Sequence, residues 1–567
     1  MALSGAAKEF LKRQTWFRPV RLAQLALRAR RRRPDWARLL PARERQSLAP
    51  PDAAPRVLIG TSVGLHLAAN AADSLFAAAL LARGAKVDVL LCDAAVPACM
   101  ACESNWFPDL DRFLAVGARD LCKACFAPAE RMFGALPVTV RRYSDFLTDE
   151  DRAWAKGLAQ NVVPADIAGL TEDAMAVGEH ALAGALRFFA RGDLATEPLG
   201  VAVMRMYLES SLLVARAARR LFRAHQYTAA VLHHGIYVPQ GLLADAASAE
   251  RTRVVAWNLA YRKRCFIFCH GETYHRALMN EPVDTWADMA WSSANDAQLR
   301  NYLVSRAGGA NDWISFYREP EEDFARIAEE FGIDRAKPIV LMLTNVIWDA
   351  QLHYPGNAFP TMLDWIVTTV EYMKTRPDLQ LVIRVHPAEV TGALPSRQRV
   401  VDELQRRFPT LPANVIVIPP DRPASSYVIA AQSNVALIYA SRMGVELAAL
   451  GLPVIVAGEA WVRNKGITSD ARDRAHYLEL LAQLPLAARL SEEQAARARK
   501  YAFHFFFRRM IPVGRFEPIS QWPFVSVKVE SVDDLKPGAD PGLDLICDGI
   551  LNEQPFVYPA ERARAEP

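Results

Sequence analysis

Residues 379–387 read Leu-Gln-Leu-Val-Ile-Arg-Val-His-Pro, and residues 435–446 read Val-Ala-Leu-Ile-Tyr-Ala-Ser-Arg-Met-Gly-Val-Glu. In both stretches a short apolar run, typical of a buried parallel strand, leads into a polar loop. The second loop opens a helix near Gly444, and Gly451-Leu-Pro-Val-Ile-Val456 supplies the next strand. Open α/β sheets bind ligands at the carboxyl ends of their strands. These stretches therefore predict an α/β fold with a ligand site at this edge.

Two series of strands follow each other along the chain. Their apolar runs lie at residues 56–60, 86–91, 229–232 and 254–257, then at 339–343, 379–385, 415–418, 435–439 and 453–456. Helical segments separate most of these runs, and a largely helical stretch leads from 258 to about 330. Such units form parallel sheets, so the sequence predicts two Rossmann-like lobes facing a cleft. The predicted units are a basic arm (1–50), a first lobe (55–330) with a cysteine-rich insertion (92–150), a second lobe (336–515) and a tail packed back on the body (516–567).

The basic arm carries thirteen Lys or Arg and three acidic residues, so it is +10 while the other 517 residues are −6. Its aromatic and leucine side chains interleave with the run Arg30-Arg31-Arg32-Arg33. This composition suits an anionic membrane surface, a helix packed on the body, or a solvated extension. Nucleic acid is not expected as a partner, since no recognition motif accompanies the charge. Without an apolar run of about 20 residues or a signal-peptide core, we expect a cytoplasmic protein, with peripheral binding at the inner membrane face as a further option.

Polar residues at the strand ends of the second lobe are candidates for binding a phosphate. The imidazole of His386, fixed by Pro387, can donate a hydrogen bond or, when protonated, a charge. Gly444 allows the turn from Ser441 to approach a phosphate closely, and the helix N-terminus adds its positive dipole. Glu446, in the first turn of this helix, is suited to accepting hydrogen bonds from ribose hydroxyls. Alternatively, His386 is a buried structural histidine and Gly444 merely starts a helix.

Residues 338–480 resemble the capsule polysaccharide biosynthesis family, GT-B glycosyltransferases that include bacterial Kdo transferases. The resemblance rests on Arg384-Val-His-Pro387, Tyr439-Ala-Ser-Arg-Met-Gly-Val-Glu446, Gly451-Leu-Pro453 and Lys465-Gly-Ile-Thr468. It implies that His386 and Ser441 hold the phosphate of a nucleotide-activated sugar, with a CMP-sugar favoured. The usual second motif has Ser or Thr after the serine, where this chain has Arg442-Met443, so the donor base stays open. Asn345, at the strand end, and Lys465 join the predicted donor-binding residues.

An inverting transferase needs a general base, and no catalytic metal is expected if the protein neutralises the leaving group. In enzymes of this type the base commonly lies on a first-lobe loop facing the cleft. His66, on the loop after the first strand, is the leading candidate, and Asp73 could orient it or be the base itself. Alternatively, His66 only begins the following helix.

The acceptor side of the cleft is predicted from a second loop. His233-His234-Gly235-Ile236-Tyr237 follows the strand at 229–232 and suits sugar or phosphate contact, or forms a simple turn. Aromatic faces and Arg bind glycans and anionic sugars well. The predicted acceptor-binding residues are His234, Tyr237, Tyr261, Arg262 and His275.

The cysteines form two pairs, Cys99-x2-Cys102 and Cys122-x2-Cys125. Two CxxC pairs at this spacing are typical of a structural zinc site, in which four thiolates complete a tetrahedron. An iron–sulfur cluster and free thiols are the alternatives. Disulfides are not expected in the cytoplasm.

Together these features predict an inverting glycosyltransferase acting on a surface-polysaccharide or lipid-linked acceptor. The alternatives are a polyol-phosphate transferase of the same cell-envelope chemistry, and a non-catalytic assembly protein that retains the fold.

Overall fold

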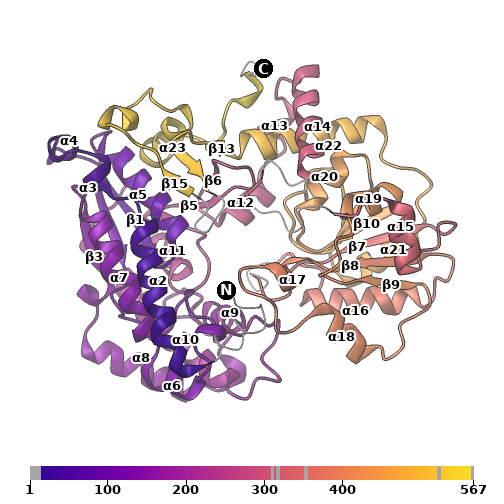
Figure 1. Ribbon diagram of the computed structural model, residues 1–567, viewed down its shortest axis with the longest axis horizontal. Coiled ribbons are helices and arrows are strands. Elements are labelled where there is room, and N and C mark those ends of the chain that lie inside the picture. Colours follow the sequence, from indigo (N-terminus) through magenta and orange to yellow (C-terminus); the bar gives the residue numbers. More distant parts are fainter. Residues whose placement is uncertain (1–13, 308–311, 314–319, 350–354, 520–524, 563–567) are drawn as a thin grey trace, which may run out of the picture.

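The computed structural model describes residues 14–307, 312–313, 320–349, 355–519 and 525–562. Two sheets lie side by side, each between layers of helices (Figure 1). The predicted α/β class is confirmed. The α-helices are α2 (Arg18–Arg32), α3 (Trp36–Leu39), α4 (Ala42–Ser47), α5 (Leu67–Leu81), α6 (Leu110–Val116), α7 (Arg119–Phe133), α8 (Asp149–Asn161), α9 (Val177–Phe189), α10 (Gly200–Ala224), α11 (Gln240–Ala249), α12 (Tyr274–Asn280), α13 (Asp284–Ala287), α14 (Ser293–Ala307), α15 (Phe324–Phe331), α16 (Met362–Met373), α17 (Ala388–Thr391), α18 (Val400–Arg407), α19 (Ser426–Gln432), α20 (Met443–Ala449), α21 (Arg474–Ala482), α22 (Glu492–Phe503) and α23 (Pro541–Asn552).

The first sheet has seven strands in the order β13-β6-β5-β4-β1-β2-β3. They are β1 (Arg56–Ser62), β2 (Lys86–Leu91), β3 (Thr139–Arg142), β4 (Ala229–His233), β5 (Arg253–Leu259), β6 (Cys265–His270) and β13 (Ile511–Pro512). From β3 to β5 the neighbours are parallel, whereas β6 is antiparallel to both β5 and β13. The expectation of a helical stretch from 258 onward is therefore wrong over 265–270, where β6 forms a hairpin with β5.

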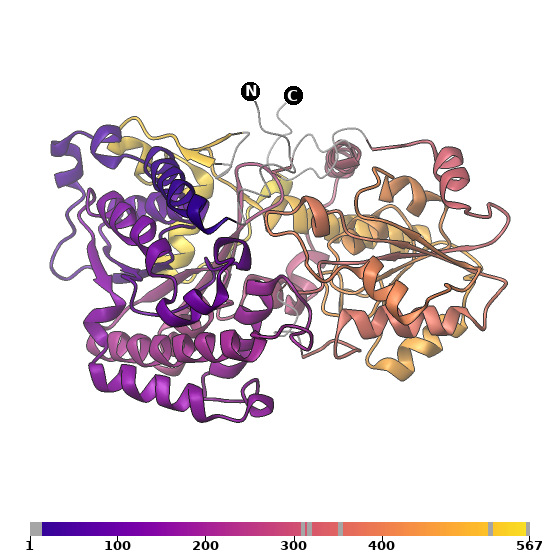
Figure 2. The ribbon, with the colours of Figure 1, turned by 60° about the horizontal axis from the view of Figure 1, so that its bottom comes forward.

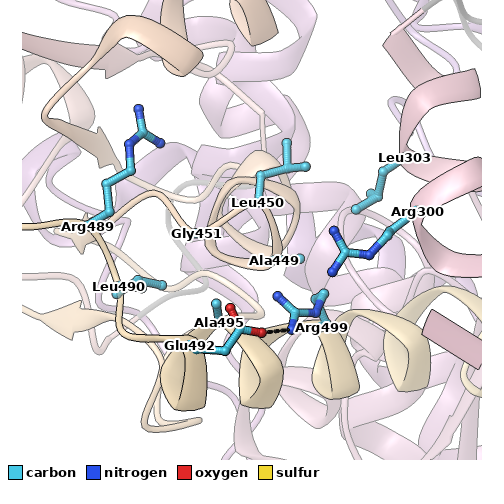
Figure 3. Close-up of a pocket in the computed structure, with 10 residues that line it drawn as sticks. All are labelled: Arg300, Leu303, Ala449, Leu450, Gly451, Arg489, Leu490, Glu492, Ala495 and Arg499. Carbon is cyan, nitrogen blue, oxygen red and sulfur yellow. Dashed lines mark hydrogen bonds and ion pairs between the residues drawn. The ribbon is translucent and has the colours of Figure 1, made fainter. Parts of the chain in front are cut away.

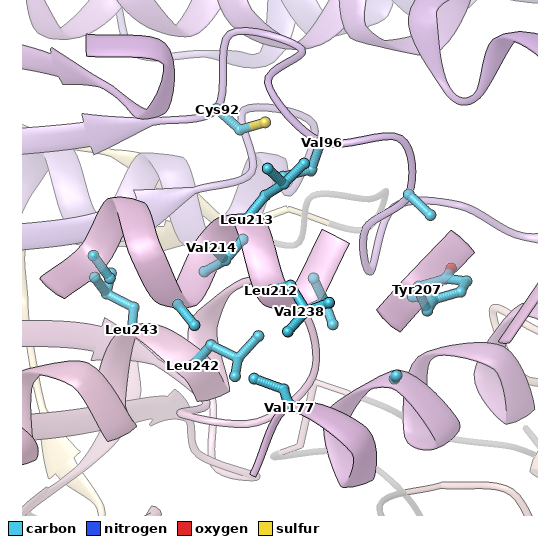
Figure 4. Close-up of a cluster of buried hydrophobic side chains, with 14 of the residues drawn as sticks. Cys92, Val96, Val177, Tyr207, Leu212, Leu213, Val214, Val238, Leu242 and Leu243 are labelled. Carbon is cyan, nitrogen blue, oxygen red and sulfur yellow. The ribbon is translucent and has the colours of Figure 1, made fainter. Parts of the chain in front are cut away.

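Helices cover both faces of the first sheet because the strands are apolar on both sides. On one face α5 is buried along its whole length, and its alanines permit this close packing. On the other face α9, α10 and α11 pack together, and their apolar side chains converge with Val238 in Figure 4.

Residues 92–150 supply part of the first sheet. Helix α7 connects β2 to the parallel edge strand β3, so it is the crossover helix of a βαβ unit. The sequence interpretation of a cysteine-rich insertion is corrected here, because Cys122 and Cys125 lie on this crossover helix.

The second sheet has six parallel strands in the order β12-β11-β10-β7-β8-β9. They are β7 (Ile339–Leu343), β8 (Gln380–Arg384), β9 (Val415–Ile418), β10 (Val435–Ile438), β11 (Val454–Val456) and β12 (Ser469–Asp470). The five runs predicted from the sequence all form strands here. β10 lies next to β7, so the loops that follow these two strands emerge side by side.

The C-terminal part of the chain lies against the first sheet (Figure 1). β13 pairs with β6, and α23 packs against α5. A two-stranded sheet of β14 (Phe516–Pro518) and β15 (Val525–Val527) lies in the same region. The guanidinium of Arg83 pairs with the carboxylate of Asp544, which fixes this contact electrostatically.

Candidate functional site

The candidate site lies where loops from the two sheets meet. Tyr237, four residues after β4, donates its hydroxyl hydrogen to Oδ1 of Asp349, six residues after β7, at 2.8 Å. At a second point Gln398 accepts a hydrogen bond from the amide of Gly192 at 2.9 Å. Loops that follow β4 and β7 therefore meet here, at the place of the predicted cleft between the two sheets.

Three imidazoles lie together on the side of the first sheet. The ring centroids of His66 and His233 are 4.6 Å apart, as are those of His233 and His234. Burial lowers the pKa of His66 and of His234 to about 4, and the positive charge of Arg187 on α9 contributes to both shifts. At neutral pH these imidazoles are uncharged.

His66 begins α5, as the alternative interpretation anticipated. Its Nδ1 accepts a hydrogen bond from the amide of Ala69 at 3.2 Å. A neutral imidazole that accepts at Nδ1 carries its proton at Nε2. His66 can therefore donate to a substrate, but it cannot take up a proton at Nε2 in this arrangement.

Asp73 lies beneath the cleft rather than in it. Its side chain is 1% exposed and accepts hydrogen bonds from Thr61 (2.7 Å) and from the indole of Trp257 (3.0 Å). The prediction that Asp73 orients His66 is corrected, because Thr61 and Trp257 engage both carboxyl oxygens of Asp73 in the core around the first sheet.

Asp73→Asn is expected to raise stability at pH 8 relative to the wild type and to leave it unchanged at pH 4. Burial raises the pKa of Asp73 to about 7, whereas an unfolded chain ionises near pH 3.9. The contribution of the protonated carboxyl is full below pH ~4 and is lost as the pH rises through 7. Asn retains both bonds, since the Thr61 hydroxyl can reverse its direction. Urea unfolding at both pH values checks this, and a parallel loss of stability in the two proteins would contradict it.

On the side of the second sheet, His386 is held as a hydrogen-bond donor. Its amide donates to Oγ1 of Thr344 at 3.0 Å, and its Nδ1 accepts from the amide of Ala388 at 3.1 Å. Burial, Arg442 and Arg384 lower its pKa to about 4. The neutral ring therefore carries its proton on Nε2, and Pro387 fixes the start of the short helix α17. Of the two roles considered for His386, this geometry favours the hydrogen bond over the charge.

The neighbouring strand ends are tied together beside His386. Oδ1 of Asn345 accepts from the amide of Ala440 at 3.3 Å, and Oγ of Ser441 accepts from the amide of Met443 at 3.3 Å. The guanidinium of Arg442 stacks 3.8 Å from the ring centroid of Tyr261. Tyr261 follows β5, so this stacking joins the two sides of the cleft.

Gly444 serves close packing in this structure. A Cβ at this position would lie 2.4 Å from Cδ1 of Ile438 and 3.0 Å from Cγ1 of Val462. The glycine lets α20 approach β10, and its predicted role of approaching a phosphate is not what the surroundings show.

Glu446 is fully buried and does not face the cleft. Its carboxylate lies 3.2 Å from Arg306 and 3.1 Å from Arg442, and it accepts a hydrogen bond from Tyr427. Burial alone would raise the pKa of Glu446, but the two guanidinium groups outweigh it and lower the pKa. The predicted contact with ribose is therefore corrected: Glu446 compensates the charges of the buried Arg306 and of the half-buried Arg442.

Three other predicted binding residues are engaged in structural contacts. Nζ of Lys465, which is 0% exposed, donates to the carbonyls of Met279 (2.8 Å) and Glu281 (2.6 Å). Arg262 donates to the carbonyl of Phe506 at 3.0 Å. The buried ring of His275 bonds through Nε2 to the carbonyl of Glu459 at 3.0 Å. Lys465 and His275 are buried in these contacts, so their predicted ligand-binding roles are corrected. Arg262 is only half-buried, and its acceptor-binding role stays a prediction.

Arg187 was not anticipated from the sequence. Its guanidinium lies 3.6 Å from the carboxylate of Glu103 and 5.9 Å from the ring of Tyr237, and its buried Nη1 has no hydrogen-bond partner. Nδ1 of His234 is likewise buried without a partner. An arginine in the last turn of an amphipathic helix gives no local signal that it reaches a binding site.

The cysteines do not converge as metal ligands. Cys122 and Cys125 lie one turn apart on α7, and the Cys99 and Cys102 thiols, both free, are close enough to form a hydrogen bond. Within the described ranges no three His, Cys, Asp or Glu side chains form a metal-binding group. The zinc site stays a prediction that this arrangement does not fit.

A separate pocket of about 230 Å³ lies between α14, α20 and α22 (Figure 3). Its charged lining consists of Arg300, Arg489, Arg499 and Glu492, and Glu492 pairs with Arg499. None of the predicted site residues lines it, so it is distinct from the cleft.

Comparisons with known proteins find one family-model match, over residues 317–497. Residues 317–497 match the family model described as capsule polysaccharide biosynthesis protein. No curated protein matches the chain. Solved structures with detectable similarity include KpsC of Thermosulfurimonas dismutans, a β Kdo 2,4 transferase (14% identity, 48% of this chain and 79% of that chain, TM-score 0.33). They also include UDP-GlcNAc 2-epimerase from Neisseria meningitidis bound to UDP-GlcNAc (11%, 88% and 100%, 0.25) and the spinosyn rhamnosyltransferase SpnG (12%, 79% and 95%, 0.25). Over residues 317–497, which contain the entire second sheet, this chain is similar to capsule polysaccharide biosynthesis proteins, and the family resemblance indicated by its sequence motifs is confirmed.

Proposed function

We propose that this protein is a GT-B glycosyltransferase of surface-polysaccharide assembly. It transfers a sugar from a nucleotide-activated donor, with a CMP-sugar favoured, to a growing or lipid-linked glycan. The observation that carries the proposal is that loops at the strand ends of both sheets meet, with His386 at a strand end of the second sheet and the imidazole cluster at strand ends of the first. The family match of residues 317–497 supports it.

On the donor side, His386 and Ser441 bind the phosphate, with Asn345 and Pro387 holding their loops in place. Arg442 lies close enough to lower the pKa of His386, and its guanidinium, although paired with Glu446, brings further N–H donors to this loop. A guanidinium and a ring N–H offset the charge that develops on a leaving phosphate. The proposed donor-binding residues therefore no longer include Glu446 and Lys465, which the sequence had suggested.

On the acceptor side, the general base is assigned to Asp349. The side chain of Asp349 is exposed, yet desolvation by the residues around it raises its pKa. The hydrogen bond from Tyr237 offsets part of this rise. A base works best when its pKa is near the working pH. Burial moves the pKa of Asp349 upward, toward that pH, and moves the pKa of His66 and of His234 downward, away from it, so the role of base is assigned to the carboxylate. His66 and His234 then bind acceptor hydroxyls, and Tyr261 offers an aromatic face.

The proposal is tested by incubating the purified full-length chain with CMP-, UDP- and GDP-sugars and a glycan acceptor. Acceptor-dependent release of one nucleotide, with the sugar found in the product by mass spectrometry, is the expected result. Phosphate in the product would instead indicate a polyol-phosphate transferase. A chain that binds glycan but releases no nucleotide from any donor would be an assembly protein.

The hydroxyl of Tyr237 is expected to tune the base. Tyr237→Phe removes a hydrogen bond that favours the ionised carboxylate, so the pKa of Asp349 rises. The acidic limb of the profile of kcat/KM against pH is therefore expected to move to higher pH. An unchanged limb would argue against Asp349 as the group that this profile reports.

A further inference from the structure

One face of helix α2 packs against the part of the molecule built around the first sheet. The guanidinium of Arg21 lies 4.2 Å from the ring of Trp106 and donates to the carbonyl of Asn105 at 2.9 Å. Arg18 lies 5.1 Å from the ring of Phe107 and 3.4 Å from the carboxylate of Asp120 on α7. Ala29, further along the same face, is fully buried. The helix therefore has a defined orientation on the outside of the molecule (Figure 2).

The opposite face of this segment is apolar and exposed. Trp16 is 67% exposed, Val20 44% and Leu27 49%, and together they are three of the eight large exposed hydrophobic side chains in the described ranges. Residues four and seven positions apart lie on one side of a helix. Val20 and Leu27 thus form a stripe with Trp16 at its N-terminal end, on the side away from Ala29.

Arginines border the stripe, and no acidic residue interrupts it. Arg28, Arg30 and Arg31 are exposed, and α2 contains neither Asp nor Glu. Among the residues that the structure describes, no helix combines the length and the apolar character required to cross a bilayer. An amphipathic helix of this composition suits a position in the plane of a membrane interface.

We infer that this outer face, formed by Trp16, Val20, Leu27, Arg28, Arg30 and Arg31, docks on an anionic lipid bilayer. The apolar side chains insert among the lipid headgroups and the guanidinium groups bind lipid phosphates. Charge complementarity favours a lipid surface over a second copy of this chain, because two copies of the same face would place arginines against arginines. The inference deepens the proposed function: it rests on a lipid-linked acceptor being presented at the surface where the enzyme docks.

Vesicle co-sedimentation of the full chain tests this inference without any nucleotide or acceptor. We expect binding to vesicles of phosphatidylcholine with phosphatidylglycerol, weak binding to phosphatidylcholine alone, and a decrease with added salt. Each basic residue contributes about 1 kcal/mol near an anionic surface, so the triple variant Arg28→Gln, Arg30→Gln, Arg31→Gln should bind about 100-fold more weakly. The pair Val20→Ser and Leu27→Ser should weaken binding as well.

The matched control is the pair Val163→Ser and Val201→Ser, which removes two exposed valines elsewhere (59% and 42% exposed) and should leave vesicle binding unchanged. Equal binding by the arm variants and the control, or no preference for anionic vesicles, would overturn the inference. Loss of a dimer in the arm variants would show that a second copy occupies the face. Nucleotide release with a water-soluble acceptor is expected to survive in the arm variants, so a failure of docking is distinguishable from a failure of the proposed function.

Discussion

Replacing Asp349 by Asn is expected to lower kcat by about 10²–10⁴-fold, the range for loss of a general base. The amide keeps the shape of the side chain and can still accept the hydrogen bond from Tyr237, but it cannot take up the acceptor proton. Since the donor phosphate is held by His386 and Arg442 in the proposed site, the KM for the donor should change little. Initial rates at saturating donor and acceptor measure this effect.

A matched control is Asp364→Asn, which changes a half-buried carboxylate at the start of α16 and should retain wild-type kcat. If Asp349→Asn kept full activity while His234→Gln lost it, the base would be His234. A similar loss of activity in His66→Gln alone would return the role to His66, which would then have to give up its bond to Ala69.

Glu446→Gln is expected to destabilise the second half by about 3–5 kcal/mol, because it leaves buried guanidinium groups without their counter-charge. Arg306 is 2% exposed at its side chain and depends on Glu446 and Asp312 for compensation. Urea unfolding at pH 7 measures the change. The exposed Glu492, whose side chain is 83% exposed although it pairs with Arg499, is the control. Glu492→Gln should cost no more than about 1 kcal/mol.

The same variant separates the observed role of Glu446 from the one expected from the sequence. If Glu446→Gln unfolded like the wild type but bound nucleotide more weakly, the carboxylate would be acting as a ribose ligand after all.

Local sequence patterns were sufficient for most of the strands. The runs at 86–91, 339–343 and 415–418 coincide with β2, β7 and β9, because short apolar runs between turn residues have few other stable conformations. β6 was missed although its sequence, Cys-Phe-Ile-Phe-Cys-His, is apolar. β6 pairs antiparallel with β5. The miss arose because an alternation of strands and helices predicts parallel strands and gives no sign of a hairpin among them.

The candidate site was predictable in position but not in orientation. His386, Ser441, His234 and Tyr237 lie at strand ends, and the topology brings them to one cleft. Whether a charged side chain points into the cleft depends on distant partners, such as Arg306 for Glu446 and the carbonyl of Glu281 for Lys465. Arg187 reaches the cleft from the end of α9, and only the packing of that helix reveals it.

The central claim is that the cleft holds a nucleotide through His386. The most direct test is a thermal-shift panel of CMP, CDP, UDP, UMP and GDP on the wild type, on His386→Ala and on His476→Ala as a control in the same half. A nucleotide at a hundredfold excess over Kd stabilises the folded state by about 2.7 kcal/mol. The account predicts a shift with one nucleotide, retained in His476→Ala and lost in His386→Ala. No shift with any nucleotide, or an equal shift in all three proteins, would contradict it.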